Sequence, residues 1–170
     1  GYKNVINEAL RLNAEGIDCP LAIETSGHAA MRENYFLDDG AYLVTKIIIQ
    51  MAILRREGRS LDDLLLPLKE PAEATEKRIP IAAEDFRPFG EQVIADLKQY
   101  AADRNWDIAP DNHEGIRISF PKDDGDGWFL LRLSVHDPIM PLNLESNTPG
   151  GTDLLLQHVK DFAAEKYADM

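Results

Sequence analysis

The segment WFLLRLSVHDP, residues 128–138, alternates apolar and polar side chains in its second half and ends in a turn before proline. Because successive side chains of a strand point to opposite faces, residues 129, 131, 133 and 135 are expected to face a core. Arg132 and Ser134 then point together to the other face, roughly 6.6 Å apart along the strand. Forked hydrogen bonds from an arginine and a serine hydroxyl at this spacing fit one phosphate. We therefore predict a phosphate site at this strand end, next to His136.

The charge of the chain leaves one alternative open for Arg132. The sequence has 30 Asp and Glu residues against 18 Lys and Arg residues, a net charge of −12. In so acidic a chain a surface arginine commonly pairs with a neighbouring carboxylate. The same charge disfavours nucleic acid as a partner, since that binding depends on clustered basic side chains. An anionic ligand therefore requires local hydrogen-bond donors whose attraction exceeds the repulsion from the net negative charge. Salt screens that repulsion within about 8 Å.

A second polar cluster follows the short apolar stretch 20–23 and consists of Glu24-Thr25-Ser26-Gly27-His28. The pattern predicts a buried strand that ends in this loop. A carboxylate can accept from two adjacent sugar hydroxyls, Ser26 adds a third contact, and Gly27 permits close approach of the ligand. On composition alone, the alternative of an ordinary turn with a solvated histidine is favoured.

The composition is typical of a globular protein with a packed core. Apolar residues make up 44% and charged residues 28% of the 170 positions. The longest apolar run, residues 43–54, falls short of the roughly 20 residues that cross a bilayer. Cys19 is the single cysteine, so no internal disulfide is possible. The chain opens on Gly1 without a methionine or a signal segment, and we expect a piece of a longer cytoplasmic protein.

Apolar periodicity predicts two units. In the first, residues 1–68, we expect a helix over 3–13, the strand 20–23, a helix from about 40 to 57 that is covered on most sides, and a short helix after Ser60. Residues 69–77 have the Pro, Glu, Lys and Ala composition of a linker.

The second predicted unit, residues 78–170, combines an antiparallel sheet with helices on one face. Its expected elements are a strand 78–82, a helix 89–104, strands 106–109, 115–120, 128–135 and 142–145, and a final helix capped by Thr152.

Both polar loops resemble those of the alpha-D-phosphohexomutase family. Its third domain carries a Gly-Glu-x-Ser-Gly-His type sugar loop, similar to residues 23–28, and its fourth an Arg-x-Ser-x-Thr-x-Pro type phosphate loop, similar to residues 132–138. Gly1-Tyr2-Lys3 is similar to a Gly-aromatic-Lys segment found before the sugar loop in part of the family. The resemblance covers nearly the whole chain. The sequence departs from the family pattern at Ile23, where the family often has Gly, and at His136, where the family often has Thr.

The resemblance implies a fold of the α/β plus α+β kind. The C-terminal part of a mixed α/β domain would be followed by a small TATA-box-binding-protein-like domain with a four-stranded antiparallel sheet. It also implies residue roles. Glu24 and Ser26 contact sugar hydroxyls, His28 lies close to the reacting groups, and Lys3 is a weaker candidate near the reacting oxygen. The phosphate that is not transferred is held by Arg132, Ser134 and His136.

The activity implied is a reversible shift of phosphate between C6 and C1 of a hexose through a bisphosphorylated intermediate. In the family a phosphoserine donates the phosphate and an Asp-rich loop holds magnesium, and neither motif occurs in this sequence. We expect both in N-terminal domains outside this chain, which alone should be inactive. Two alternatives stay open: a non-catalytic sugar-phosphate binding or regulatory module, and a purely structural interaction domain. Glucose and mannose phosphates both remain candidate substrates.

Overall fold

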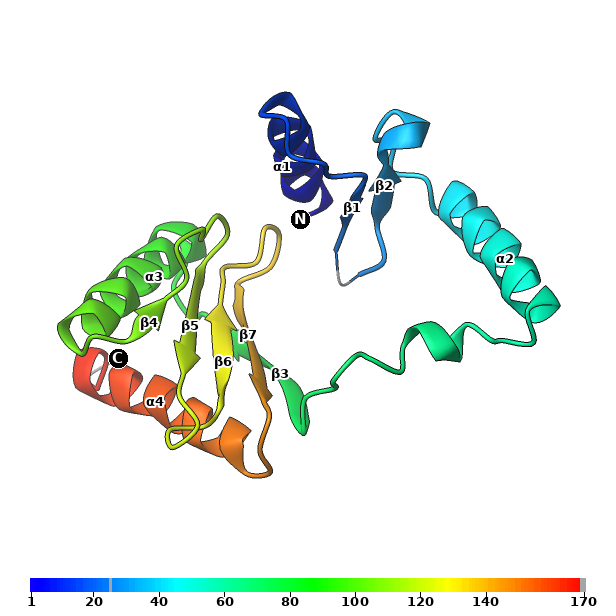
Figure 1. The fold of residues 1–170 in the computed structure, drawn as a ribbon. Helices are drawn as coiled ribbons and strands as arrows, with labels where there is room; N and C mark the ends of the chain where they lie inside the picture. Colours follow the sequence, from blue (N-terminus) through cyan, green and yellow to red (C-terminus); the bar gives the residue numbers. More distant parts are fainter. Residues whose placement is uncertain (25, 169–170) are drawn as a thin grey trace. The chain divides into compact units, whose positions relative to one another are not determined.

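The computed structural model describes residues 1–24 and 26–168. The chain divides into two compact units, residues 1–68 and the part from Lys69 onward, and each is described by itself (Figure 1). None of the helices in these residues is long and apolar enough to cross a membrane.

The first unit contains a short antiparallel hairpin flanked by helices. Its elements in chain order are α1 (Tyr2–Ala14), β1 (Leu21–Ile23), β2 (Ala29–Met31), the 3-10 turn η1 (Arg32–Asn34), α2 (Gly40–Arg56) and the 3-10 turn η2 (Asp62–Leu64). Ala9, Ala22, Ala30 and Phe36 form a small core between α1 and the hairpin. Asp39 begins α2, because its carboxylate accepts a hydrogen bond from the amide of Tyr42 at 3.0 Å.

Two expectations about burial in this unit are wrong for the residues described. The predicted buried strand, β1, buries only Ala22 and leaves Ile23 48% exposed. The predicted covered helix, α2, buries only Leu54. Six of its large apolar side chains are between 37% and 54% exposed, namely Val44, Ile47, Ile48, Ile49, Met51 and Ile53. The physical reason is that no described segment packs over these side chains.

The second unit is an antiparallel sheet with two long helices. Its elements are β3 (Glu73–Pro80), α3 (Phe86–Asp103), β4 (Asp107–Ile108), β5 (Ile116–Phe120), β6 (Gly127–Leu131), β7 (Ile139–Ser146) and α4 (Gly151–Lys166). Within the described residues the strand order is β3-β7-β6-β5-β4. The sheet therefore has the five strands that the periodicity predicted, rather than the four that the family resemblance implied, and β3 is the edge strand beside β7.

The core of this unit lies on one face of the sheet. Ile118, Phe129 and Leu144 stand opposite one another across β5, β6 and β7, and all three are buried. Leu97 from α3 and Leu155 from α4 belong to the same core and are fully buried. Both helices therefore cover the same face, which confirms the predicted arrangement of sheet and helices.

Three local predictions differ from the structure. Residues 73–77 of the predicted linker belong to β3, where Glu76 pairs with Asn143 in register. The predicted strand 128–135 ends at Leu131 because its neighbour β5 begins at Ile116, directly opposite. Val135, which was expected to face the core, is 57% exposed on the loop beyond that end. The cap of α4 is Gly150, not Thr152.

Candidate functional site

The candidate sugar loop joins the two strands of the hairpin. The amide of Glu24 donates to the carbonyl of His28 at 3.1 Å, which closes the loop directly beyond the Ile23–Ala29 pair. The amide of Gly27 donates to the carbonyl of Glu24 at 2.9 Å, and Gly27 has a φ of +89°. Glycine is therefore needed for its backbone conformation, since a Cβ at this position would meet no atom within 4 Å. Thr25 lies outside the described residues.

Glu24 and Ser26 are brought together on this loop. The hydroxyl of Ser26 donates to Oε1 of Glu24, while the Glu24 side chain is 23% exposed. Carboxylate oxygens have several acceptor sites, so Glu24 can accept from a further hydroxyl without losing Ser26. The pair forms a small polar surface that a polyol can reach.

His28 is oriented by two neighbours, one polar and one aromatic. Its Nδ1 lies 2.7 Å from Oδ2 of Asp38, and its ring stacks on Tyr2 with the centroids 5.2 Å apart. Because Nδ1 is engaged by this carboxylate, Nε2 is the ring nitrogen left for a ligand. No local pattern in the sequence pairs Asp38 with His28, and the neighbouring Asp39 caps α2. The 2.7 Å contact instead makes Asp38 the residue that orients His28.

Lys3 lies in the first turn of α1, next to the Tyr2 ring that stacks on His28. Its side chain is exposed. The structure thus places Lys3 beside a residue that contacts the candidate loop, without a described contact of its own to Glu24, Ser26 or His28.

The candidate phosphate loop continues β6 along the edge of β7. The amide of Arg132 donates to Pro141 at 3.1 Å and the amide of Ser134 donates to Ile139 at 3.0 Å. The hydroxyl of Ser134 accepts from the amide of Asp137 at 3.2 Å. Because that hydroxyl is used as an acceptor, its own proton remains available for an oxygen of a ligand.

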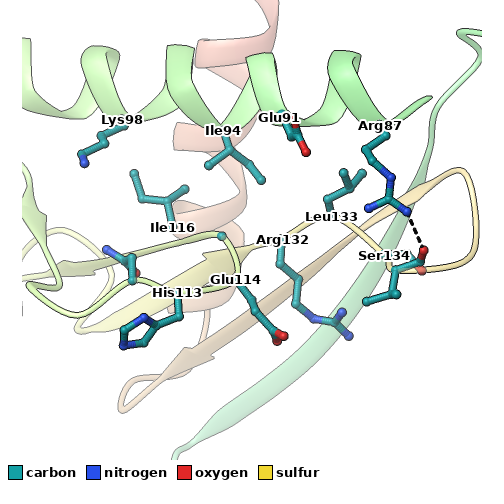
Figure 2. A pocket seen from close by; sticks show the side chains of 13 residues that line it. Arg87, Glu91, Ile94, Lys98, His113, Glu114, Ile116, Arg132, Leu133 and Ser134 are labelled. Carbon is teal, nitrogen blue, oxygen red and sulfur yellow. Dashed lines mark hydrogen bonds between the residues drawn. The ribbon is translucent and has the colours of Figure 1, made fainter. Parts of the chain in front are cut away.

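Arg132 and Ser134 line a pocket of about 500 Å³ between α3 and the segments around residues 112–116 and 132–135. Figure 2 shows Arg87 and Ser134 at one end and Lys98 and His113 at the other, with Ile94, Ile116 and Leu133 between them. The lining carries three permanent cations, Arg87, Lys98 and Arg132, against the carboxylates of Glu91 and Glu114. In a chain of net charge −12, this local balance favours an anion.

Arg132 has no ion pair or hydrogen bond through its side chain with any residue in the described part of the chain. The alternative of a surface arginine held by a neighbouring carboxylate is therefore not what the structure contains. The nearby Glu76 is engaged elsewhere. Its carboxyl pKa is lowered by hydrogen bonds from Arg78 and Asn143, with only a small electrostatic contribution from Arg132.

His136 is separated from the pocket. It is exposed and does not line the cavity that Arg132 and Ser134 share. The sequence did not indicate Arg87 as a site residue. Its guanidinium reaches the candidate phosphate loop from α3. No local pattern marks it, because Arg87 and Val135 are 48 positions apart.

Among residues 1–24 and 26–168, no three His, Cys, Asp or Glu side chains come together as a metal site.

The fold is similar to that of a phosphoglucomutase/phosphomannomutase family protein from Burkholderia thailandensis, whose structure was determined by X-ray crystallography. The TM-score is 0.64 at 22% sequence identity, over 93% of this chain. The chain spans 30% of the length of that protein. No family model and no curated protein matches the sequence. The likeness shows a shared fold.

Proposed function

We propose that the chain is the C-terminal portion of a cytoplasmic phosphohexomutase that interconverts hexose 6-phosphate and hexose 1-phosphate through a bisphosphorylated intermediate. One observation carries the proposal. The fold matches a mutase-family protein over 93% of the chain, and both family-like loops lie at strand ends with reachable polar groups. In this proposal the second unit is the TATA-box-binding-protein-like domain of the enzyme.

The proposed role of the hairpin loop is to read the sugar. Glu24 accepts from ring hydroxyls, and Ser26 stays paired to it so that the carboxylate has one preferred orientation. His28, held by Asp38, presents Nε2 toward the reacting end of the hexose. Lys3 is a secondary candidate for that end. Either glucose or mannose phosphate fits this set of donors and acceptors.

The proposed role of the second loop is to hold the phosphate that is not transferred. Arg132 supplies forked donors and Ser134 supplies its hydroxyl proton. His136, on the exposed part of the loop, contacts the same phosphate from outside the pocket. In this proposal, phosphate binding at the second loop holds the hexose at a fixed distance from the phosphoryl donor. Contacts that position the substrate in this way accelerate phosphate transfer.

The parts that transfer phosphate are proposed to lie in N-terminal domains of the same protein. These are the phosphoserine, which forms the covalent phosphoryl donor, and the loop that binds magnesium. In this proposal the part of this chain in the reaction is to bind and orient the hexose phosphate.

The experiment that tests the proposal is calorimetric titration of the chain with glucose 1-phosphate, mannose 1-phosphate, inorganic phosphate and glucose. We expect a hexose phosphate to bind more tightly than inorganic phosphate or glucose, because both its hydroxyls and its phosphate have proposed binding groups in the chain. The Glu24→Gln variant should lose that preference and keep its phosphate affinity and thermal midpoint. Glu15→Gln, which removes a carboxylate paired with Arg11 on the same unit, serves as the control.

Equal affinity for hexose phosphate and inorganic phosphate in the wild-type chain would contradict the sugar-reading role. If hexose phosphate binds as expected but the complete protein shows no mutase activity, the chain is a non-catalytic sugar-phosphate binding module instead.

A further inference from the structure

Arg87 bridges α3 and the candidate phosphate loop. It lies in the first turn of α3, and its Nη2 donates to the carbonyl of Val135 at 2.9 Å, drawn as a dashed line in Figure 2. The packing next to this bond is also close. A Cβ at Gly90 would lie 2.4 Å from Cδ1 of Leu133, so the start of α3 sits directly on the loop.

The loop has hydrogen-bonded support from a strand on one side only. The amides of Arg132 and Ser134 point toward β7, where Pro141 and Ile139 accept from them. Carbonyls of the alternate residues point the other way, toward β5. That strand begins at Ile116 opposite Leu131, so it does not reach Val135. Arg87 therefore supplies the hydrogen bond that a neighbouring strand would otherwise give.

The hydrogen bond from Arg87 to the Val135 carbonyl fixes the backbone at the point that follows Arg132 and Ser134 and precedes His136. Arg132 and Ser134 both line the pocket, and Arg87 lines it beside them. If the Val135 carbonyl were released, the 133–136 segment would lose its restraint on the α3 side. The Ser134 hydroxyl would then lose its fixed position relative to Arg132.

We infer that Arg87 is a positioning residue for the anion site: by anchoring the Val135 carbonyl, it keeps Arg132 and Ser134 aimed at one phosphate group. This inference rests on the proposed function for the nature of the ligand. It adds a residue from α3 that neither loop motif contains.

The test uses the 170-residue chain with inorganic phosphate as the probe, followed by nuclear magnetic resonance. We expect Arg87→Gln to weaken phosphate binding about tenfold, the size expected when one charge-assisted hydrogen bond no longer holds the site. Hydrogen exchange at the Ser134 amide should be faster in this variant even without phosphate. The thermal midpoint should change little, and Arg87→Lys should recover part of the affinity because an ammonium can still donate to Val135.

Lys98→Gln is the matched control, since it removes a positive charge from the same helix and the same pocket but no bond to the loop. An equal loss of affinity in this control would overturn the inference in favour of a net-charge effect. Weaker binding by Arg87→Gln with unchanged exchange at Ser134 would also overturn it, since Arg87 would then be a direct ligand.

The proposed function can fail separately. If the chain binds hexose phosphate no better than inorganic phosphate, yet Arg87→Gln weakens phosphate binding and speeds exchange as expected, the anchoring role of Arg87 stands and the sugar-reading role falls. If hexose phosphate is preferred and Arg87→Gln binds like the wild type, only the anchoring role falls.

Discussion

Arg132 is the residue on which the proposed phosphate site depends most. Its side chain has no hydrogen-bonded or ionic partner among the described residues, and it lines a pocket whose permanent charges favour an anion. An unpaired guanidinium can bind phosphate without first breaking an internal ion pair. The forked geometry of that group is what distinguishes it from a lysine.

We therefore expect Arg132→Lys to weaken phosphate and hexose phosphate binding by roughly tenfold to a hundredfold, with little change in the thermal midpoint. Calorimetry and thermal unfolding of the variant check both parts. Arg104→Lys is the control, because Arg104 pairs with Glu165 away from the pocket. Wild-type affinity in Arg132→Lys would mean that charge alone is needed at this position and that no forked pair forms.

At the scale of elements, the start of α4 depends on a residue 77 positions earlier in the sequence. Glu73, at the start of β3, accepts from the amide of Gly150 at 2.7 Å and from the amide and hydroxyl of Thr152. The carboxylate thus satisfies donors at the helix start, where negative charge is also favoured. These hydrogen bonds, that from Gly150 first, lower the pKa of the Glu73 carboxyl.

The lowered pKa gives a pH prediction. Because the folded-state value lies below the ordinary glutamate value of about 4.3, the stabilisation is present in full above that pH. It is lost as the pH falls through the folded-state pKa. Glu73→Gln should therefore lower the thermal midpoint at about pH 7, and the difference from the wild type should shrink at about pH 3. Glu70→Gln is the control. If the difference in thermal midpoint between Glu73→Gln and the wild type stayed constant over this pH range, the charge of Glu73 would contribute nothing to stability.

The apolar surface of α2 leads to a second prediction at this scale. Val44, Ile47, Ile48 and Met51 recur at helical spacing and are all at least 37% exposed. Contiguous exposed apolar surface of this kind commonly marks a site of association. We expect the 170-residue chain to self-associate and bind a hydrophobic dye, and Val44→Glu with Ile48→Glu to reduce both effects. Leu154→Glu, at a single exposed leucine on α4, should not. A monomeric wild-type chain that binds no dye would contradict this.

Several elements follow from the sequence, and the exceptions have physical causes. The helices α1, α2 and α4 and the hairpin loop are readable from periodicity and from capping or turn residues. β3 is only partly readable: its end lies in the predicted strand 78–82, but residues 73–77 are mostly polar and an edge strand has only one neighbour to pair with. Its pairing with β7 joins segments more than sixty residues apart, as Glu76 and Asn143 show. Local composition therefore suggested a linker.

The candidate sites were predictable to a similar degree. Arg132 with Ser134 and Glu24 with Ser26 are close in sequence, and the structure brings each pair together. Asp38 and Arg87 became visible only in the fold, since their partners His28 and Val135 lie on other elements. Their roles toward a ligand stay predictions.

At the scale of the whole molecule, the central claim is that the hairpin loop of the first unit binds sugar hydroxyls and the loop after β6 in the second unit binds phosphate. The most direct measurement is chemical-shift mapping of the isotope-labelled chain during titration with glucose 1-phosphate and, separately, inorganic phosphate. We predict that glucose 1-phosphate shifts amides in 24–28 and amides in 132–136, while inorganic phosphate shifts only those in 132–136. Shifts from glucose 1-phosphate confined to one loop, or absent from both, would contradict the account.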